Sequence, residues 1–230
     1  MRIPRAILFD IGGTVLDERR YNLEAGVQAV SGRDPAAVAQ ICQAFRSERD
    51  DSHKIDREID LPRWLAEHLP LDGDKATLED TLWSTIVTLI PVPGIEPVLR
   101  RLRKDDIPLA AISNAPFSAR ILTAELEKHG LGGYLQFVLS SADLGFRKPA
   151  SVIFETALSR LGVTAEHVWF IGDTFREDIV GASRAGLEPI WISRDPIEPG
   201  IEYSGLRIRD WNEFLRLYEA ARDNQRFWIS

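Results

Sequence analysis

Short apolar runs alternate with longer segments of helical period along most of this chain. Five runs of four or five mostly apolar residues have the length and composition of buried strands: 6–9, 109–112, 135–139, 168–171 and 189–192. In the segments between them, apolar residues recur every three or four positions, as at Ile95, Val98, Leu99 and Leu102. This alternation predicts an α/β fold with a mainly parallel sheet that is covered by helices.

Glycines mark the ends of three of these predicted helices. Gly130, Gly162 and Gly186 each follow a helical pattern and precede an apolar residue, which is the usual place of a left-handed helix cap. Parallel strands are joined by right-handed crossovers, and ligands bind beyond the carboxyl ends of such strands. The polar residues that follow the apolar runs are therefore the first candidates for a functional site.

Residues 17–90 break this alternation. The segment contains helical patterns at 23–30, 38–46, 61–69 and 78–89, and it has no convincing strand. Pro91, Pro93 and Gly94 mark the return to the sheet. We therefore expect an all-helical insert at 17–90 in a core domain made of 1–16 and 91–230. The last part of the core should contain an edge strand near 206–208 and a helix from 211 to about 222.

Composition and charge narrow the class of protein. The chain has 230 residues and 44% hydrophobic residues, which is enough to bury a full core. Its formal net charge of −7, without a long basic cluster, argues against a nucleic-acid partner. The single cysteine excludes an internal disulfide, and no apolar run approaches the roughly 20 residues of a membrane span. With no signal peptide recognised, we expect a cytoplasmic protein without a membrane partner, and its oligomeric state remains open.

The first predicted strand ends on an acidic residue. Asp10 follows the run at 6–9, and Gly12, Gly13 and Thr14 come next. A carboxylate at the mouth of a parallel strand suits a nucleophile or a metal ligand, and small residues beside it expose backbone amides to an anion. A tight turn without function is the alternative explanation of this tripeptide.

Further candidate groups follow the other strands. Asp173 and Asp178 lie five residues apart after the run at 168–171, and hard cations such as Mg²⁺ prefer such oxygen ligands. Helix capping would explain one of these acids, but hardly both alongside Asp10. Ser113 with Asn114, and Lys148, offer the hydroxyl, amide and ammonium groups that a phosphoryl group needs. Each of these residues could also be a helix cap or a loop residue without function. The evidence for a site is therefore the order in which all of these groups occur along the chain.

Taken in order, these segments resemble the four motifs of the haloacid dehalogenase superfamily. The segments are ILFDIGGTVLD, AAISNAP, GFRKPASVIFE and VWFIGDTFREDIVGA, and the resemblance extends from residue 6 to about residue 192. It implies a Rossmann-like core with a helical cap of the first type between the first and second motifs, where the insert falls. It also implies a Mg²⁺-dependent hydrolase, most simply a phosphatase of small phosphorylated molecules.

The resemblance assigns roles to individual residues. It implies that Asp10 is the nucleophile and, with the Gly12 carbonyl and Asp173, a metal ligand, while Asp178 supports the metal. Ser113 and Lys148 would bind the phosphoryl group as catalytic residues. The remaining phosphate contacts would come from Gly13, Thr14 and Asn114.

One position departs from the pattern of the phosphatases. They usually carry a second aspartate, which serves as the general acid and base, where this chain has Gly12. That loss leaves open a dehalogenase or phosphonatase-like hydrolase, or a weakly catalytic phosphate-binding or regulatory protein. Asp17, His53 and Glu58 are candidate substitutes for the missing acid. A phosphonatase would need a reactive lysine in the cap, for which Lys54 and Lys75 are weak candidates.

Overall fold

The computed structural model describes residues 3–71, 73–193 and 203–227, and its centre is a six-stranded parallel sheet. The strand order is β5-β4-β1-β6-β7-β8, so the first strand of the chain lies near the middle of the sheet. All five neighbouring pairs are parallel. The strands are β1 (Ala6–Phe9), β4 (Leu109–Ser113), β5 (Val138–Ser140), β6 (Val168–Gly172), β7 (Glu188–Ile192) and β8 (Leu206–Ile208).

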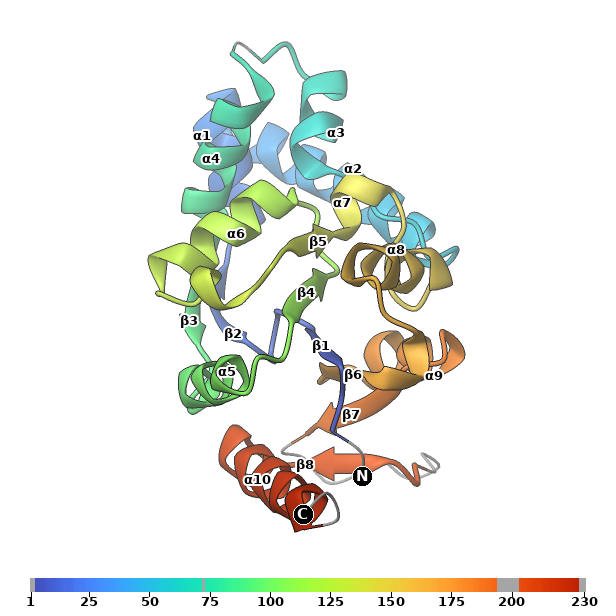
Figure 1. The fold of residues 1–230 in the computed structure, drawn as a ribbon. Coiled ribbons are helices and arrows are strands. Elements are labelled where there is room, and N and C mark those ends of the chain that lie inside the picture. Colours follow the sequence, from blue (N-terminus) through green and yellow to red (C-terminus); the bar gives the residue numbers. More distant parts are fainter. Residues whose placement is uncertain (1–2, 72, 194–202, 228–230) are drawn as a thin grey trace.

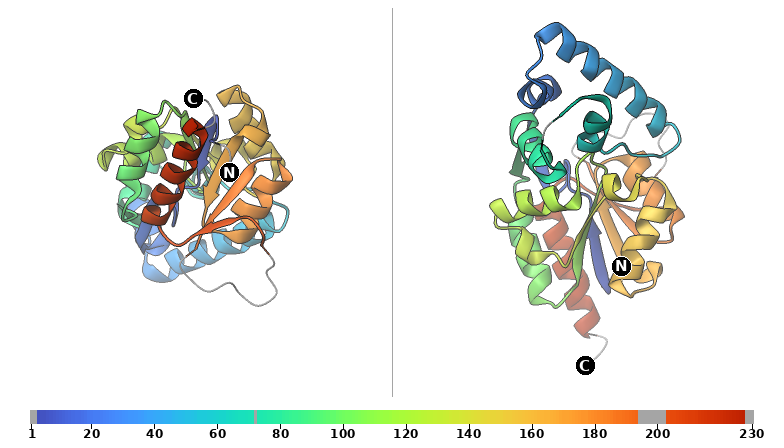
Figure 2. Two further views of the ribbon diagram at one scale, coloured as in Figure 1. Left: turned by 60° about the horizontal axis from the view of Figure 1, so that its bottom comes forward. Right: turned by 90° about the horizontal axis from the view of Figure 1, so that it is seen from above.

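Helices cover both faces of this sheet because successive strand residues point to opposite faces. Ile7 and Phe9 of β1 pack into one apolar core, and Ala6 and Leu8 pack into another. The first core is completed by α5 (Ile95–Lys104), α6 (Ala119–Lys128) and α10 (Trp211–Phe227), and the second by α8 (Ser151–Leu161) and α9 (Gly181–Arg184). Figure 2 (right) shows the green α5 and α6 and the yellow to orange α8 and α9 on opposite sides of the strands. The predicted Rossmann-like core is confirmed.

The insert folds as a cap above the sheet. It contains α1 (Leu23–Ser31), α2 (Pro35–His53), α3 (Leu61–His68) and α4 (Lys75–Ile86), which share a separate apolar core. Each of these helices begins after a side chain that accepts a hydrogen bond from its first turn, namely Asn22, Asp34, Asp60 and Asp74. Figure 1 shows the four helices together at one end of the molecule, far from β8 and α10.

The two connections between cap and core differ from the prediction. Residues 16–21 and 87–91 form an antiparallel pair of strands, β2 (Leu16–Tyr21) and β3 (Val87–Pro91). The helix expected at 78–89 therefore ends at Ile86. Four of the six residues of β2 are exposed, so the strand shows no apolar alternation along the sequence. The body of the insert is helical as expected, but its base is a two-stranded ribbon.

Most remaining elements lie where the sequence placed them. Strand β8 falls at the predicted position, and Gly130, Gly162 and Gly186 all have positive φ. Helix α10 begins at Trp211 as predicted but continues to Phe227, beyond the predicted end near residue 222. The strand predicted at 135–139 is shifted, because β5 begins at Val138 after a 3₁₀ turn at Gly132–Tyr134 (η1). The other short elements are α7 (Ser141–Leu144), a 3₁₀ turn at Ala165–His167 (η2) and a π-helical turn at Phe175–Val180 (η3). Among the described residues, no helix combines the length and apolar character needed to cross a membrane.

Candidate active site

The topology brings the predicted site residues to one edge of the sheet. β1 lies between β4 and β6, so Asp10, Ser113 and Asp173 follow or end three neighbouring strands. The backbone N–H of Asp10 donates to the carbonyl of Ile171, 2.8 Å away, and this fixes Asp10 beside β6. Carboxylate oxygens of Asp10, Asp173 and Asp178 all lie within 4.8 Å of one another. The three acids expected to form a metal site are therefore in one cluster.

Lys148 is the cation of this cluster. Its side chain is 1% exposed, and its Nζ donates to Asp10 Oδ1 at 2.6 Å and to Asp178 Oδ1 at 2.7 Å. It also donates to the carbonyl of Ile112 at 3.2 Å. Burial opposes a charge on Lys148, but the carboxylates of Asp10 and Asp178 outweigh that effect and raise its pKa. The ammonium is therefore charged and is held against the predicted nucleophile.

One ammonium does not neutralise three carboxylates. Burial, together with the charges of Asp178 and Asp173, raises the pKa of Asp10 to about 8, although Lys148 acts in the opposite direction. Burial and the charge of Asp178 likewise raise the pKa of Asp173 to about 6. The cluster therefore carries unbalanced negative charge, which fits a divalent cation held by hard oxygen ligands. Asp10, Asp173 and Asp178 offer the carboxylate oxygens at this place, and the Gly12 carbonyl stays a predicted ligand.

Asp178 has a clear structural role in this arrangement. Its Oδ1 accepts from Lys148, and its Oδ2 accepts from the backbone N–H of Thr174 at 2.9 Å. A Cβ atom on Gly172 would lie 2.4 Å from the Asp178 carboxyl carbon, so only glycine fits at that strand end. Asp178 thus orients Lys148 and the loop after β6, and its direct role at a metal stays a prediction.

The loop after Asp10 brings small residues close to the acidic cluster. Gly13 has a φ of +72°, and a Cβ atom there would lie 2.3 Å from Asp173 Oδ2, so the position requires glycine. Gly12 is different, because it lies outside the left-handed region and a Cβ atom would meet nothing within 4 Å. Thr14 is buried, and its Oγ1 has no hydrogen-bond partner among the described residues. The absence of a carboxylate at position 12 is therefore not imposed by backbone strain or crowding.

Asn114 connects β4 to the loop that carries Lys148. Its Oδ1 accepts from the backbone N–H of Lys148 at 2.8 Å, and its Nδ2 donates to the Lys148 carbonyl at 3.0 Å. These two bonds fix the backbone from which the ammonium extends. Ser113, 6% exposed, precedes Asn114 at the end of β4. The structure thus brings together all four motifs that the sequence singled out.

A cavity of about 300 Å³ separates the cap from this part of the core. Its lining residues are Glu18, Tyr21, Arg49, His53 and Glu58 from the cap side, and Asn114, Pro116 and Arg147 from the core. Two of the candidate substitutes for the missing acid, His53 and Glu58, therefore line a cavity beside the active site. Asp17 is not among the lining residues, and its nearest ion-pair partner is Arg19 at 3.8 Å.

Sequence reasoning missed the two arginines of this cavity. Arg49 lies in a highly charged stretch of α2, a pattern that normally indicates a solvated helix face. Arg147 directly precedes Lys148, and this adjacency was the only signal available.

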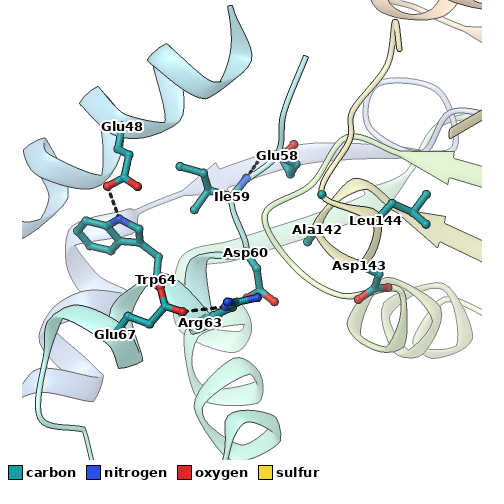
Figure 3. Close-up of a pocket in the computed structure, with 11 residues that line it drawn as sticks. Glu48, Glu58, Ile59, Asp60, Arg63, Trp64, Glu67, Ala142, Asp143 and Leu144 are labelled. Atoms are coloured by element: carbon teal, nitrogen blue, oxygen red, sulfur yellow. Dashed lines mark hydrogen bonds and ion pairs between the residues drawn. The ribbon is translucent and has the colours of Figure 1, made fainter. Parts of the chain in front are cut away.

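A larger cavity of about 390 Å³ opens on the other side of Glu58 (Figure 3). Its charged lining consists of five carboxylates and one guanidinium: Glu48, Glu58, Asp60, Glu67, Asp143 and Arg63. Figure 3 shows Glu48 directed at the indole of Trp64 and Glu67 directed at Arg63, with hydrogen bonds of 2.7 and 2.8 Å. So much negative charge opposes a phosphorylated ligand. The smaller cavity is therefore the better candidate for the substrate.

Known proteins resemble this chain in sequence and in fold. Residues 4–186 match the sequence model of a family described as haloacid dehalogenase-like hydrolase. The chain is 33% identical over 211 residues to the ribulose-1,5-bisphosphate 5-phosphatase of Halopiger xanaduensis, which covers 84% of this chain and 85% of that protein. It is 34% identical over 203 residues to the glyceraldehyde 3-phosphate phosphatase of Methanopyrus kandleri, with coverages of 83% and 84%.

Solved structures show the same fold. A phosphatase from Thermococcus onnurineus superposes with a TM-score of 0.64 at 22% identity, over 94% of this chain and 97% of that one. A 2-haloacid dehalogenase from Pseudomonas syringae superposes with a TM-score of 0.66 at 22% identity, over 96% and 99%. Together with the matched family and the convergence of the four motifs, these findings show that the chain belongs to the haloacid dehalogenase-like hydrolases.

Proposed function

We propose that the protein is a Mg²⁺-dependent phosphatase that hydrolyses a small phosphorylated molecule through a phosphorylated Asp10. The observation that carries this proposal is the Asp10 carboxylate itself. It is buried at the end of the central strand, it accepts a hydrogen bond from Lys148, and it lies within 4.8 Å of two further carboxylates. A fixed carboxylate beside a buried cation is suited to attack at phosphorus and to stabilise the charge that develops.

The reaction divides into two displacements at phosphorus. In the first, an oxygen of Asp10 bonds to phosphorus while the bond from phosphorus to the alcohol oxygen breaks, and that oxygen takes up a proton. In the second, water attacks phosphorus, loses a proton, and displaces the Asp10 carboxylate to release inorganic phosphate. The Lys148 ammonium, the Ser113 hydroxyl and the Gly12 amide would bind the phosphoryl oxygens in both steps. The N–H groups of Gly13 and Thr14 donate within the loop, to the carbonyls of Leu16 and Ile11, at 2.9 and 3.3 Å. Magnesium, when bound, supplies positive charge that favours ionised Asp10 and Asp173 and offsets the charge of the phosphate.

Gly12 leaves this mechanism without its usual acid and base. General acid-base catalysis typically contributes about 10²- to 10⁴-fold, so esters with a poor leaving group should react slowly unless another side chain supplies the proton. His53 and Glu58 are the candidates that the structure places in the adjacent cavity. The Glu58 side chain is 2% exposed, and its Oε1 lies 3.2 Å from His53 Nε2. The His53 side chain is 25% exposed and keeps a second ring nitrogen, Nδ1, outside this contact, so His53 is the better candidate of the two.

Similar proteins support a small phosphorylated substrate. The relatives named above are phosphatases of a bisphosphorylated and a monophosphorylated sugar derivative, and further relatives are named phosphoglycolate phosphatase. A phosphonatase has less support, because Lys54 is 73% exposed and paired with Asp51, and Lys75 is paired with Asp60. The competing proposal, favoured by Gly12, is a binding or regulatory protein that holds phosphate with little turnover.

A panel of phosphate esters assayed with and without Mg²⁺ tests the proposed function. Purified protein should release inorganic phosphate from p-nitrophenyl phosphate and from sugar phosphates in Mg²⁺, and EDTA should stop the reaction. Halide release from 2-chloropropionate, measured alongside, tests the dehalogenase alternative. Tight phosphate binding by calorimetry without turnover of any ester would favour the regulatory alternative and contradict the proposed activity.

A further inference from the structure

The cavity between cap and core contains two arginines for which the proposed reaction has no use. They are Arg49 on α2 and Arg147 in the loop before Lys148. We propose that they bind a second anionic group, a carboxylate or a second phosphate, on the part of the substrate that leaves. This inference rests on the proposed phosphatase function and adds the substrate class to it.

The cavity shares two of its walls with the phosphate site. Asn114 lines the cavity and also holds the backbone of Lys148 through two hydrogen bonds. Arg147 is the residue before Lys148, and its backbone N–H donates to the carbonyl of Asp56 in the cap at 3.1 Å. A substrate whose phosphoryl group contacts Lys148 would therefore direct its remaining atoms past Asn114 into this cavity.

The buried side chains that line the cavity are mainly hydrogen-bond donors, and their acceptor oxygens are already bonded within the protein. Glu58 is its only buried carboxylate, and both of its oxygens are already engaged. Oε1 is contacted by the backbone N–H of Ile59 and by His53, and Oε2 accepts from Ser141 Oγ at 2.9 Å and lies 3.4 Å from Arg147 Nε. The guanidinium groups can only donate. A ligand group rich in acceptor oxygens fits such a lining better than a hydroxyl or an amine.

The guanidinium groups also have unused hydrogen-bonding capacity. Nε of Arg49 and Nε of Arg147 are both buried, and neither makes a hydrogen bond among the described residues, although Arg147 Nε lies 3.4 Å from Glu58 Oε2 in an ion pair. Buried donors without an acceptor are uncommon and unfavourable, so Arg49 Nε calls for an acceptor. Oxygens of a carboxylate or phosphate would accept from Arg49 Nε and offer Arg147 a better-placed acceptor than Glu58.

The charges agree with this assignment. Arg49 and Arg147 contribute two positive charges to the interior and Glu58 one negative charge, which leaves a formal charge of +1 with His53 neutral. Glu18 and Tyr21 lie at the exposed rim, where water screens the charge of Glu18. Arg49 Nη2 lies 3.2 Å from Asp50 Oδ1, but the Asp50 side chain is 64% exposed, so this pair leaves most of the guanidinium available. The cavity volume of about 300 Å³ limits the ligand to a small metabolite.

A matched series of esters tests the inference. The series consists of diol monophosphates, the corresponding bisphosphates and the corresponding phosphocarboxylates, with two to five carbons between the two groups. At the best chain length, kcat/KM for a doubly anionic ester should exceed that for the neutral monophosphate by roughly tenfold to hundredfold, the usual value of one or two charge-assisted hydrogen bonds. The better of the two anionic arms identifies the second group as carboxylate or phosphate.

Two variants of α2 decide whether the arginine is responsible. Arg49→Gln should reduce the preference for the doubly anionic ester by about tenfold. Arg46→Gln is the matched control, because Arg46 lies one turn earlier on the same helix, pairs with Glu24 and does not line the cavity. The control should keep the full preference. Equal kcat/KM for neutral and doubly anionic esters, or an unchanged preference in Arg49→Gln, would overturn the inference.

Binding measurements keep this test separate from the proposed function. In the Asp10→Asn background, which cannot form the phosphorylated enzyme, the bisphosphate should bind roughly tenfold more tightly than the monophosphate, and Arg49→Gln should remove the difference. If no ester is hydrolysed but the binding preference is present, the phosphatase function fails and the anion site stands. If esters are hydrolysed and the two ligands bind equally, the phosphatase function stands and the anion site fails.

Discussion

Replacing Lys148 by methionine tests whether the acidic cluster depends on its single ammonium. Methionine has a similar length but cannot donate to Asp10, Asp178 or the carbonyl of Ile112, the three acceptors that the ammonium now contacts at 2.6 to 3.2 Å. Breaking a buried ion pair by removing one partner costs about 3–5 kcal/mol, because the remaining charge is left unpaired. In EDTA at about pH 8, Lys148→Met should therefore lower the free energy of unfolding by about 3–5 kcal/mol.

The loss should depend on pH in a defined direction. The pKa of Asp10 is about 8 in the folded state and 3.8 for an ordinary exposed aspartate, so the folded state holds a proton more tightly than the unfolded state. That contribution to stability is fully present below about pH 4 and is lost as pH rises through about pH 8, so the metal-free protein loses stability over this range. Lys148→Met raises the cost of ionising these carboxylates further. The destabilisation should therefore be smaller at pH 5 than at pH 8, and Mg²⁺ should restore part of it at pH 8.

Thermal and urea unfolding followed by circular dichroism measure this effect. For a chain of this length, about 3–5 kcal/mol corresponds to a fall in Tm of roughly 6–20 °C. Lys54→Met is the matched control, because Lys54 is exposed and its ion-pair partner in the described part of the chain is the exposed Asp51. The Tm of this variant should stay at the wild-type value. An unchanged Tm in Lys148→Met, or a loss of the same size at pH 5 and pH 8, would refute the electrostatic reasoning.

Three further predictions concern the metal and the missing acid. Asp173→Asn should weaken Mg²⁺ binding in calorimetry, and unchanged affinity in this variant would remove Asp173 from the ligand set. The Mg²⁺ affinity of the wild type should rise between pH 6 and pH 8, because Mg²⁺ competes with the protons that Asp173 and Asp10 retain. Gly13→Ala should lose most Mg²⁺ affinity as well, since its Cβ would lie 2.3 Å from Asp173 Oδ2, and a variant of wild-type affinity would show that the loop relaxes freely. A Cβ atom at position 12 would meet nothing within 4 Å. Gly12→Asp should raise kcat/KM more for an alkyl phosphate than for p-nitrophenyl phosphate, within the usual 10²- to 10⁴-fold contribution of a general acid. Equal gains on both esters would mean that protonation of the leaving group does not limit the rate.

The sequence predicted those site residues that lie at the carboxyl ends of strands. Asp10, Ser113 and Asp173 each follow or end an apolar run, and the rule that ligands gather at the carboxyl ends of parallel strands was enough to place them together. Lys148 lies in a loop, and its position depended on the resemblance of the four motifs. Its buried contacts with two carboxylates come from tertiary structure, and no local pattern indicates them.

The parts that were missed depend on pairing partners far apart in the chain. β2 and β3 pair residues more than 65 positions apart, and the exposed residues of β2 give no alternating pattern for recognition. Leu135 is apolar and was therefore included in the predicted strand at 135–139. It packs against the core directly after the turn at Gly132–Tyr134, before β5 begins. Arg49 and Arg147 come together only because the cap folds over the loop before Lys148. Charged residues on a helix face do not reveal such a contact in advance.

The phosphorylated form of Asp10 is the central element of the proposed mechanism, and trapping it is the most direct test. Protein mixed with p-nitrophenyl phosphate and Mg²⁺, quenched in acid within one turnover and digested, should yield the peptide that contains Asp10 with one added phosphoryl group. Asp10→Asn should yield no such peptide and no phosphate release, with an unchanged circular dichroism spectrum. Steady phosphate release by the wild type without a modified peptide, or turnover by Asp10→Asn at the wild-type rate, would contradict covalent catalysis by Asp10.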